Sequence, residues 1–434
     1  LPRKNKIALI AVSDGSLQLL KELDWRYPMG LSLSPDGRQI VYDFPAGEHP
    51  SNHDIFLLTV DDRKVTPLLE HPANDFVLGW VPGSRRILFA SDRTGHWGMW
   101  MVSVDQNGQP LAPAKLIKKD TGLIRPLGFT RDGSFYYGIG RDQIDVFTAE
   151  LDLESGAMLG PPAPAIQEFM GSNQSPAWSP DGRYLAYTSG WSPVPRSTLL
   201  CIRSEETGKV RKLSPPLTRF RGLRWSPDGR AILTIGADLK DRRGAFLIDV
   251  QSGEVILDFI RPFLPFPPEW ASAGKAIVFA DKDFEKTQSQ IVRRDLASGQ
   301  EKKIGPMTEG SILNRVRVSP DGGQLAARHW RPNNQPIELV VLSGNGGELR
   351  PLLSIDDPNG LMDLAWAPDG KQLLYFKGVG ELPHNGELWA ISVEGGEPRY
   401  LGISTGYVRQ LSVHPDGKQI VFAGSSRDDE PQVW

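Results

Sequence analysis

Two absences constrain the fold before any motif is considered. The 434 residues contain one cysteine, so no internal disulfide can form and packing must hold the fold together. That residue, Cys201, lies in the apolar run 199–202, as is typical of a small buried side chain rather than a reactive thiol. No apolar run approaches the roughly 18 residues of a membrane-spanning helix, so the sequence predicts no membrane insertion.

Charge and periodicity exclude further classes of protein. The formal net charge is only −3, and acidic and basic residues are interspersed along the chain. A nucleic-acid-binding surface needs a concentrated basic face, so we expect no nucleic-acid partner. Helical periodicity of apolar residues is also missing, whereas 45 glycines and 36 prolines supply turns for many short strands. These features predict an all-β protein.

A Pro-Asp-Gly phrase recurs along the whole chain. Complete copies include Trp178–Gly182, Trp225–Gly229 and Trp366–Gly370, and degenerate copies such as Trp80–Gly83 fill the gaps. The Asp positions, or their equivalents, fall 45 to 49 residues apart, at 36, 83, 132, 181, 228, 273, 321, 369 and 416. A period of about 40 to 50 residues with four short strands in each unit is typical of a β-propeller.

The turn and the chain ends predict how these units assemble. In the turn, Pro fixes φ near about −65°, Asp tolerates the next position, and Gly supplies the positive φ that leads into a strand. Residues 7–20 match the third and fourth strands of a unit, and residues 418–422 match a second strand. Pairing these ends would complete a composite last blade and close the ring without a long exposed edge. We therefore predict a single domain, residues 1–434, that forms one closed propeller of nine four-stranded blades, with eight blades as the alternative.

The same residues carry a family resemblance. The phrase Trp-Ser-Pro-Asp-Gly-Arg at 178–183 and 225–230, and the strand and hairpin at 87–95, resemble the repeats of TolB-type propellers, also called PD40 or WD40-like repeats. The resemblance covers nearly the whole chain and rests on turn and packing residues, so it specifies the fold more than the function. It implies a bacterial, extracytoplasmic (periplasmic) interaction module.

Long, varied connections between second and third strands are expected on one face of the ring, which we call the loop face. Loops on a rigid frame are where binding residues concentrate. The candidate binding residues near these loops are His49, His53, His384, Trp97, Trp191 and Trp330. The histidines are spread over several blades, so we predict no metal site and no cofactor. Solvated histidines and, for Trp97, packing between blades are the alternative interpretations.

One column of the repeat carries charge on the strands expected at the ring axis. The residue before the aromatic or apolar marker of the turn is small in six units, but in three consecutive units it is Arg224, Glu269 and Arg317. Charges near the axis must be paired or hydrated. Two interpretations remain open: a mutually neutralising ladder between blades, and an anion or carboxylate site in the channel.

The sequence gives little sign of catalysis. Residues 402–406 fit Gly-x-Ser-x-Gly, but a nucleophile elbow needs a helix after the serine, and none is predicted there. We find no phosphate loop, HExxH helix or metal-ligand spacing. The favoured interpretation is a non-catalytic scaffold or sensor that binds a protein or peptide as part of a larger bacterial protein. The alternative is a propeller hydrolase or the gating propeller of a prolyl-oligopeptidase-like peptidase.

Overall fold

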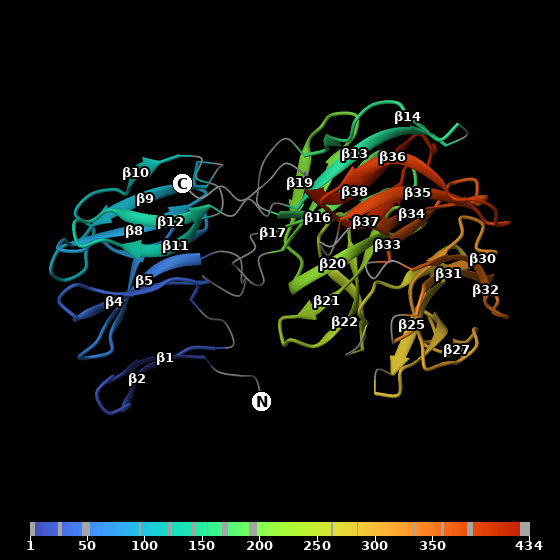
Figure 1. The fold of residues 1–434 in the computed structure, drawn as a ribbon. Coiled ribbons are helices and arrows are strands. Elements are labelled where there is room, and N and C mark those ends of the chain that lie inside the picture. The colour runs from blue at the N-terminus through green and yellow to red at the C-terminus, as the bar shows by residue number, and fades with distance from the viewer. Residues whose placement is uncertain are drawn as a thin grey trace.

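A computed structural model describes residues 5–24, 28–45, 53–94, 97–119, 121, 124–139, 144–153, 155–166, 172–190, 198–261, 264–283, 285–332, 335–356, 360–379 and 385–425. Within these residues the secondary structure is β throughout, apart from one short 3-10 turn at Ser272–Gly274. The predictions of an all-β fold and of four-stranded antiparallel blades are confirmed. Figure 1 shows the strands gathered into two lobes.

The serine of the recurrent phrase explains why the chain turns there. In the copy at 179–182, the Ser179 hydroxyl donates to Asp181 Oδ1 over 2.6 Å and accepts the backbone N–H of Tyr184 over 2.9 Å. The hydrogen bond from Ser179 holds the pKa of Asp181 below its usual value. Gly182 then adopts φ +72°, a conformation that favours glycine. The copies with Ser34, Ser226 and Ser319 repeat this chemistry, so each of these inner strands is joined tightly to the second strand of its blade.

The second lobe contains six sheets, five of which are built from consecutive strands. These five are β16 (Ser172–Trp178), β17 (Tyr184–Gly190), β18 (Leu199–Ser204) and β19 (Val210–Leu213); β20 (Leu217–Trp225), β21 (Ala231–Asp238), β22 (Arg243–Asp249) and β23 (Val255–Ile260); β24 (Glu269–Ala271), β25 (Ala276–Asp283), β26 (Gln288–Asp295) and β27 (Glu301–Lys303), with β28 (Thr308–Glu309) beside β26; β29 (Ile312–Val318), β30 (Gln324–Trp330), β31 (Ile337–Ser343) and β32 (Arg350–Ile355); and β33 (Leu361–Trp366), β34 (Gln372–Gly378), β35 (Gly386–Ser392) and β36 (Arg399–Thr405).

The sixth sheet joins distant parts of the chain. It combines β37 (Tyr407–Val413) and β38 (Gln419–Ser425) with β13 (Asp145–Asp152) and β14 (Ala157–Met158), with β15 (Ala163–Pro164) beside β13. Strand β13 pairs with β38 over six residues, from Asp145 opposite Gly424 to Glu150 opposite Gln419. This composite sheet closes the second lobe into a ring.

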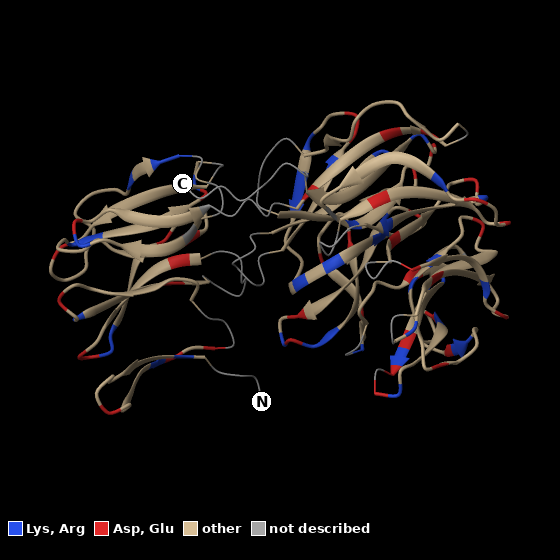
Figure 2. Cartoon of the chain, in the orientation of Figure 1, with Lys and Arg blue, Asp and Glu red and all other residues tan. Residues whose placement is uncertain are grey.

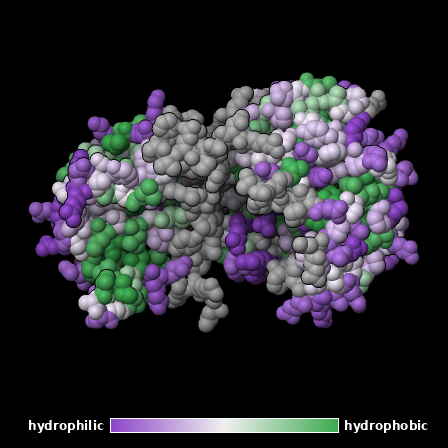
Figure 3. Space-filling view, in the orientation of Figure 1, coloured by the Kyte–Doolittle hydropathy of each residue, from purple (hydrophilic) through white to green (hydrophobic). Residues whose placement is uncertain are grey.

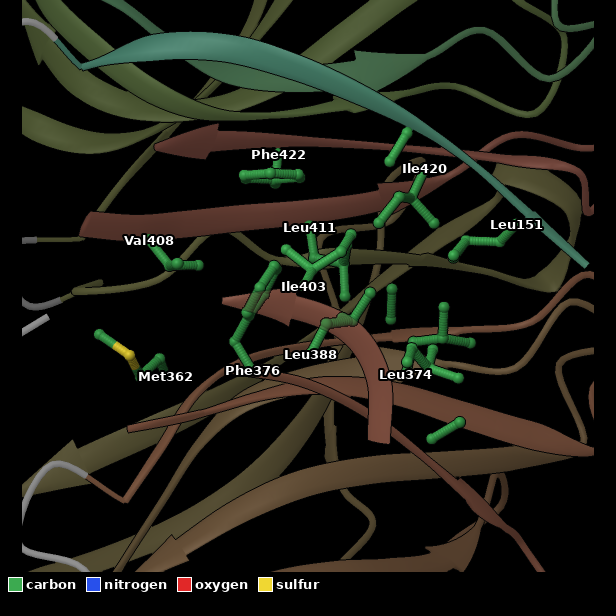
Figure 4. Packing of buried hydrophobic residues seen from close by; sticks show 14 of the residues in the cluster. Leu151, Met362, Leu374, Phe376, Leu388, Ile403, Val408, Leu411, Ile420 and Phe422 are labelled. Carbon is green, nitrogen blue, oxygen red and sulfur yellow. The ribbon is translucent and has the colours of Figure 1, made fainter. Parts of the chain in front are cut away.

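Buried apolar clusters join the six sheets pairwise around this ring. One cluster packs Leu151 of β13 and Val408 and Leu411 of β37 against Phe376 and Leu388 of the preceding sheet (Figure 4). Five further clusters link the remaining neighbours, so every sheet of the ring buries apolar residues on both sides. Burial of such side chains stabilises the fold by roughly 1.5–3 kcal/mol each.

Three tryptophan markers of the repeat tie neighbouring blades together by hydrogen bonds. Trp225 Nε1 donates to the carbonyl of Ala177 over 3.0 Å, and Trp270 Nε1 donates to the carbonyl of Arg224 over 3.2 Å. Trp366 Nε1 donates to the carbonyl of Arg317 over 3.2 Å. Each indole therefore fixes its own inner strand to the inner strand of the blade before it.

The first lobe is a row of sheets rather than a ring. It contains β1 (Lys6–Ile10) with β2 (Leu17–Glu22); β3 (Leu31–Leu33), β4 (Gln39–Pro45), β5 (His53–Thr59) and β6 (Val65–Leu69); β7 (Asp75–Trp80), β8 (Arg86–Ser91), β9 (Gly98–Ser103) and β10 (Lys115–Lys118); and β11 (Ile124–Phe129) with β12 (Phe135–Ile139). Three buried clusters join these four sheets in order. Figure 3 shows apolar side chains gathered on the part of this lobe where β1 and β2 lie, and Ile10 and Leu17 are 63% and 69% exposed.

These pairings show that the ring does not close in the way we predicted. We expected the C-terminal strands to complete a blade with residues 7–20, but β38 pairs with β13, and β1 pairs with β2. The count of nine blades in one ring is not confirmed, because the closure at β13 encloses six sheets and leaves three repeats' worth of strands before it. The two candidate partners of β38, namely β1 and β13, are both outer strands of a blade, so the pattern of apolar residues alone does not distinguish them.

Candidate functional site

The predicted charged column forms a continuous ion-pair ladder across the inner strands of the ring. Arg224 on β20 donates from Nε to Glu269 Oε1 on β24, and Arg317 Nη1 on β29 donates to the same oxygen over 2.9 Å. Arg317 Nη2 continues the ladder to Asp363 Oδ1 on β33 over 2.8 Å. The four side chains are between 0% and 15% exposed, so the ladder lies inside the ring. The predicted Arg–Glu–Arg ladder is therefore present, and Asp363 is an additional member of it.

Mutual attraction keeps the ladder charged despite its burial. Burial alone would raise the pKa of Asp363, but Arg317 and Arg315 outweigh it and hold that pKa below its usual value. The backbone N–H of Leu411 on β37 also donates to Asp363 Oδ2 over 3.0 Å. Burial opposes the charge of Arg224, yet the contact with Glu269 raises its pKa above the ordinary value. The ladder therefore links β20, β24, β29, β33 and β37, five of the six inner strands.

A second group of charges, all positive, lies beside the ladder toward the loop face. We call it the mouth cluster; its members are Arg221 on β20, Lys282 on β25, Arg315 on β29, Arg328 on β30 and Arg409 on β37. Figure 2 shows basic residues along β20 in the second lobe. Burial lowers the pKa of Arg221, and so do the nearby charges of Arg409 and Arg219. Positive side chains from several blades therefore lie near one another in this part of the ring.

A recurrent β-bulge shapes this part of the inner strands. Ser175, Gly222, Arg315 and Gln410 all have φ between +50° and +70°, and each stands three residues before the marker of its repeat. The strand pairing shifts register at each of these positions. Such a conformation is strained for arginine. Bulges of this kind re-aim side chains on a strand, and here the bulge places Arg315 near Asp363, 3.3 Å from its Oδ1.

Two cations of the mouth cluster share one aromatic ring. Lys282 Nζ lies 4.9 Å, and Arg315 Cζ 4.6 Å, from the ring centroid of Phe266. Burial, together with Arg328 and Arg315, lowers the pKa of Lys282 to about 7. Burial and Arg315 lower the pKa of Arg328 to about 10, and Arg328 Nε is buried without a hydrogen-bond partner. Arg315 thus lowers the pKa of two neighbouring cations, Lys282 and Arg328.

Among the residues predicted near the loop face, His53 lies elsewhere than expected. His53 is not in a loop: it begins β5, is 2% exposed, and its Nδ1 lies 3.0 Å from Asp43 Oδ1. Trp97 packs on Phe76, with ring centroids 5.4 Å apart. Trp330 ends β30 and is 37% exposed. His49, Trp191 and His384 lie outside the described residues. The structure does not gather His53, Trp97 and Trp330 into one site, because β5 and β9 belong to the first lobe and β30 to the ring.

A serine, a histidine and a glutamate are hydrogen-bonded in series between β29, β30 and β31. Ser311 Oγ lies 2.8 Å from His329 Nε2, and His329 Nδ1 lies 3.2 Å from Glu338 Oε2. Ser311 and His329 help to line a pocket of about 710 Å³. Both residues are about 95% buried, since their exposed fractions are 5% and 6%. Burial also lowers the pKa of His329, which favours the neutral imidazole. We interpret the series as a structural link at the start of a blade.

This interpretation makes a prediction about Ser311. Although the order of the three groups is that of a serine-hydrolase triad, a fluorophosphonate probe should not label Ser311. Ser311→Ala should lower the free energy of unfolding by about 1 kcal/mol, the contribution of one hydrogen bond. Mass spectrometry of the probe-treated chain checks the first expectation and urea unfolding the second. Covalent labelling that Ser311→Ala abolishes would contradict the structural role.

The remaining chemistry-bearing motifs give no further site in the described residues. Residues 402–405 lie on β36, which leads directly into β37, so the Gly-x-Ser-x-Gly pattern is not a nucleophile elbow. Across the described ranges, three or more His, Cys, Asp or Glu side chains nowhere converge as metal ligands. The described part of the chain also has no helix long and apolar enough to cross a membrane.

Comparisons with known proteins bear first on the class of fold. No family model matches the sequence. The structure resembles a putative TolB from Agrobacterium tumefaciens with a TM-score of 0.52 and 16% sequence identity, over 65% of this chain and 98% of that one. The resemblance to TolB-type propellers is therefore confirmed for the fold.

Curated relatives correct the functional interpretation. The chain is 22% identical over 384 residues to a probable dipeptidyl-aminopeptidase B of Talaromyces marneffei, and 24% identical over 208 residues to the uncharacterized peptidase YuxL of Bacillus subtilis. The matches cover 78% and 46% of this chain but only 39% and 28% of the relatives. Both relatives are named peptidases, so the prediction of a non-catalytic scaffold or sensor, and with it of a protein that is not an enzyme, is wrong.

Several residues of the site escaped the sequence analysis. Asp363 and Arg315 stand three residues before their markers, and Arg221 and Arg409 stand four before theirs. The predicted ladder rests on the column directly before the marker, whereas these further charges stand two and three columns earlier in the repeat. Lys282 and Arg328 lie on second strands, where nothing in the repeat distinguishes a channel-facing cation from a solvated one.

Proposed function

We propose that this chain is the propeller portion of a peptidase and that its ring receives the peptide substrate. The observation that carries the proposal is the match to a dipeptidyl-aminopeptidase over 78% of this chain. The closed ring supports it, because a polar axis lined by Arg224, Glu269 and Arg317 suits the polar backbone of a peptide. In this proposal the ring receives and orients the peptide, and neither Ser311, which is buried, nor Ser404, which lies within a strand, is the nucleophile.

Peptide hydrolysis by the natural gene product that contains this chain tests the proposal. We expect release of p-nitroaniline from aminoacyl or dipeptidyl p-nitroanilides, and loss of that activity after treatment with a fluorophosphonate. Ser311→Ala in the same product serves as a control and should retain the activity. A product that cleaves no member of a broad panel of such substrates would overturn the proposal.

An extracytoplasmic location belongs to the same proposal. It is supported by the fold shared with TolB and is tested by fractionating cells that express the natural product. Recovery with cytoplasmic markers alone would contradict it.

A further inference from the structure

The geometry points to the mouth cluster as a binding site for a peptide carboxylate at the loop-face end of the ring. This inference deepens the proposed function and rests on it for the choice of a peptide as ligand. The site consists of Lys282, Arg315 and Arg328, with Arg221 and Arg409 on the inner strands two blades away on either side of Arg315. Arginine guanidinium groups match carboxylates in a planar, two-bonded geometry, so an anion of this kind fits the cluster.

The charge balance of the ring axis is the first reason. Within the described residues, the carboxylates of the ladder are Glu269 and Asp363. Arg224 and Arg317 pair with Glu269, and Arg317 also pairs with Asp363. Arg315 reaches the same Asp363 oxygen at 3.3 Å as a further cation on a shared acceptor. Arg315 thus adds a positive charge to a ladder whose acidic groups are already in use.

The packing of the cations is the second reason. Lys282 and Arg315 come from adjacent blades and rest on the same Phe266 ring, which fixes two long side chains from different sheets side by side. On the other flank, Arg328 stands opposite Asn314 in the strand pairing, next to Arg315 in the chain. Its buried Nε, which has no hydrogen-bond partner, is a donor that a ligand oxygen would satisfy. The site is therefore ordered before a ligand arrives, which reduces the entropy lost on binding.

Lys282 gives the site a pH dependence. Among the described residues, the groups close to it include Arg315 on β29, Arg328 on β30 and the Phe266 ring before β24. With a pKa of about 7, the Lys282 side chain is largely the uncharged amine at pH 8. A bound carboxylate favours the charged form and raises this pKa. Binding at pH 8 therefore takes up a proton, and the affinity falls as the pH rises from 7 to 9.

Isothermal titration calorimetry of this chain with short acetylated alanine peptides tests the inference. The peptide with a free C-terminal carboxylate should bind at least about tenfold more tightly than its amide, a difference within reach of one charge-assisted contact. An amidated peptide with one internal Glu distinguishes a side-chain carboxylate from a terminal one as the source of the anion. Titrations at pH 8 in two buffers of different ionisation enthalpy measure the proton uptake.

Matched variants separate the site from general electrostatics. Lys282→Met and Arg315→Met should each weaken binding of the acid about tenfold, whereas Lys240→Met, an exposed lysine in the turn after β21, should not. Lys282→Arg keeps a charge that does not titrate, so it should lose the proton uptake and the pH dependence. Thermal unfolding by circular dichroism confirms that each variant is folded.

Two results would overturn the inference. Equal affinity for the acid and the amide would show that the site does not recognise a carboxylate. Tighter binding of inorganic phosphate than of any peptide acid would show that its ligand is not a peptide. Because binding is measured without cleavage, these outcomes leave the peptidase proposal standing. Conversely, a natural product without hydrolytic activity would not alter the measured carboxylate preference of this chain.

Discussion

A chain that starts at residue 144 will fold into the complete ring, whereas a chain that starts at residue 153 will not. The difference is β13, whose six pairs with β38 supply the outer part of the composite sheet. Val146 and Leu151 of this strand are 0% and 1% exposed and join two of the buried clusters that link neighbouring sheets. Removing the strand exposes both clusters and opens the ring, which then retains an unprotected edge.

Far-UV circular dichroism and calorimetry measure this difference. The longer chain should give one cooperative transition, and the shorter one a broad transition or none. In the full chain, Val146→Asp should destabilise the ring by about 3–5 kcal/mol, because it buries an unpaired charge. Leu127→Asp, at a position 73% exposed on β11, is the matched control and should change stability by about 0.5 kcal/mol or less. Similar unfolding of the two truncated chains would contradict closure at β13, and failure of both to fold would support the prediction that residues 1–434 form a single domain.

Replacing Glu269 will destabilise the ring more than replacing any exposed carboxylate. Glu269 accepts hydrogen bonds from both Arg224 and Arg317, so Glu269→Gln leaves two buried guanidinium groups without their shared counter-charge. Breaking a buried ion pair from one side costs about 3–5 kcal/mol, because the remaining charge stays in a poorly solvating environment. Urea unfolding monitored by tryptophan fluorescence measures the loss.

The matched control is a glutamate with two arginine partners at the surface. Glu301 accepts from Arg261 and Arg294 and is 31% exposed, so Glu301→Gln should cost less than about 1 kcal/mol. Combining Glu269→Gln with Arg317→Met should be less damaging than the sum of the two single changes, because the second removes one of the stranded charges. Equal effects of the Glu269 and Glu301 variants would show that the ladder contributes no more than a surface pair.

The repeat made the blades predictable because its residues act locally. Ser, Pro, Asp and Gly at the turn determine the connection between two strands without reference to the rest of the chain, as Ser179 and Gly182 illustrate. Closure was not predictable for the complementary reason. Strand β38 needs an outer strand as its partner, and both β1 and β13 offer one with suitable apolar residues. The choice depends on how many blades complete the circle, which is a property of the whole ring.

The candidate site was predictable only where the charges fell in one column. Arg224, Glu269 and Arg317 share a repeat position, so their contact followed from the stacking of inner strands. His53 was misplaced because β5 begins at that residue, which the predicted loop had included. The proximity of Lys282 to Arg315 depends on Phe266, a residue in the connection to β24, and no periodic pattern reports such a contact.

The composite sheet also dictates an order of events during synthesis. Strand β13 leaves the ribosome before five complete sheets of the ring have been made, and its partner β38 follows them. Until then β13 is an open edge able to pair with another strand, including the β38 of a neighbouring nascent chain. Exchange of this strand between two chains would give a domain-swapped dimer that uses only native pairings.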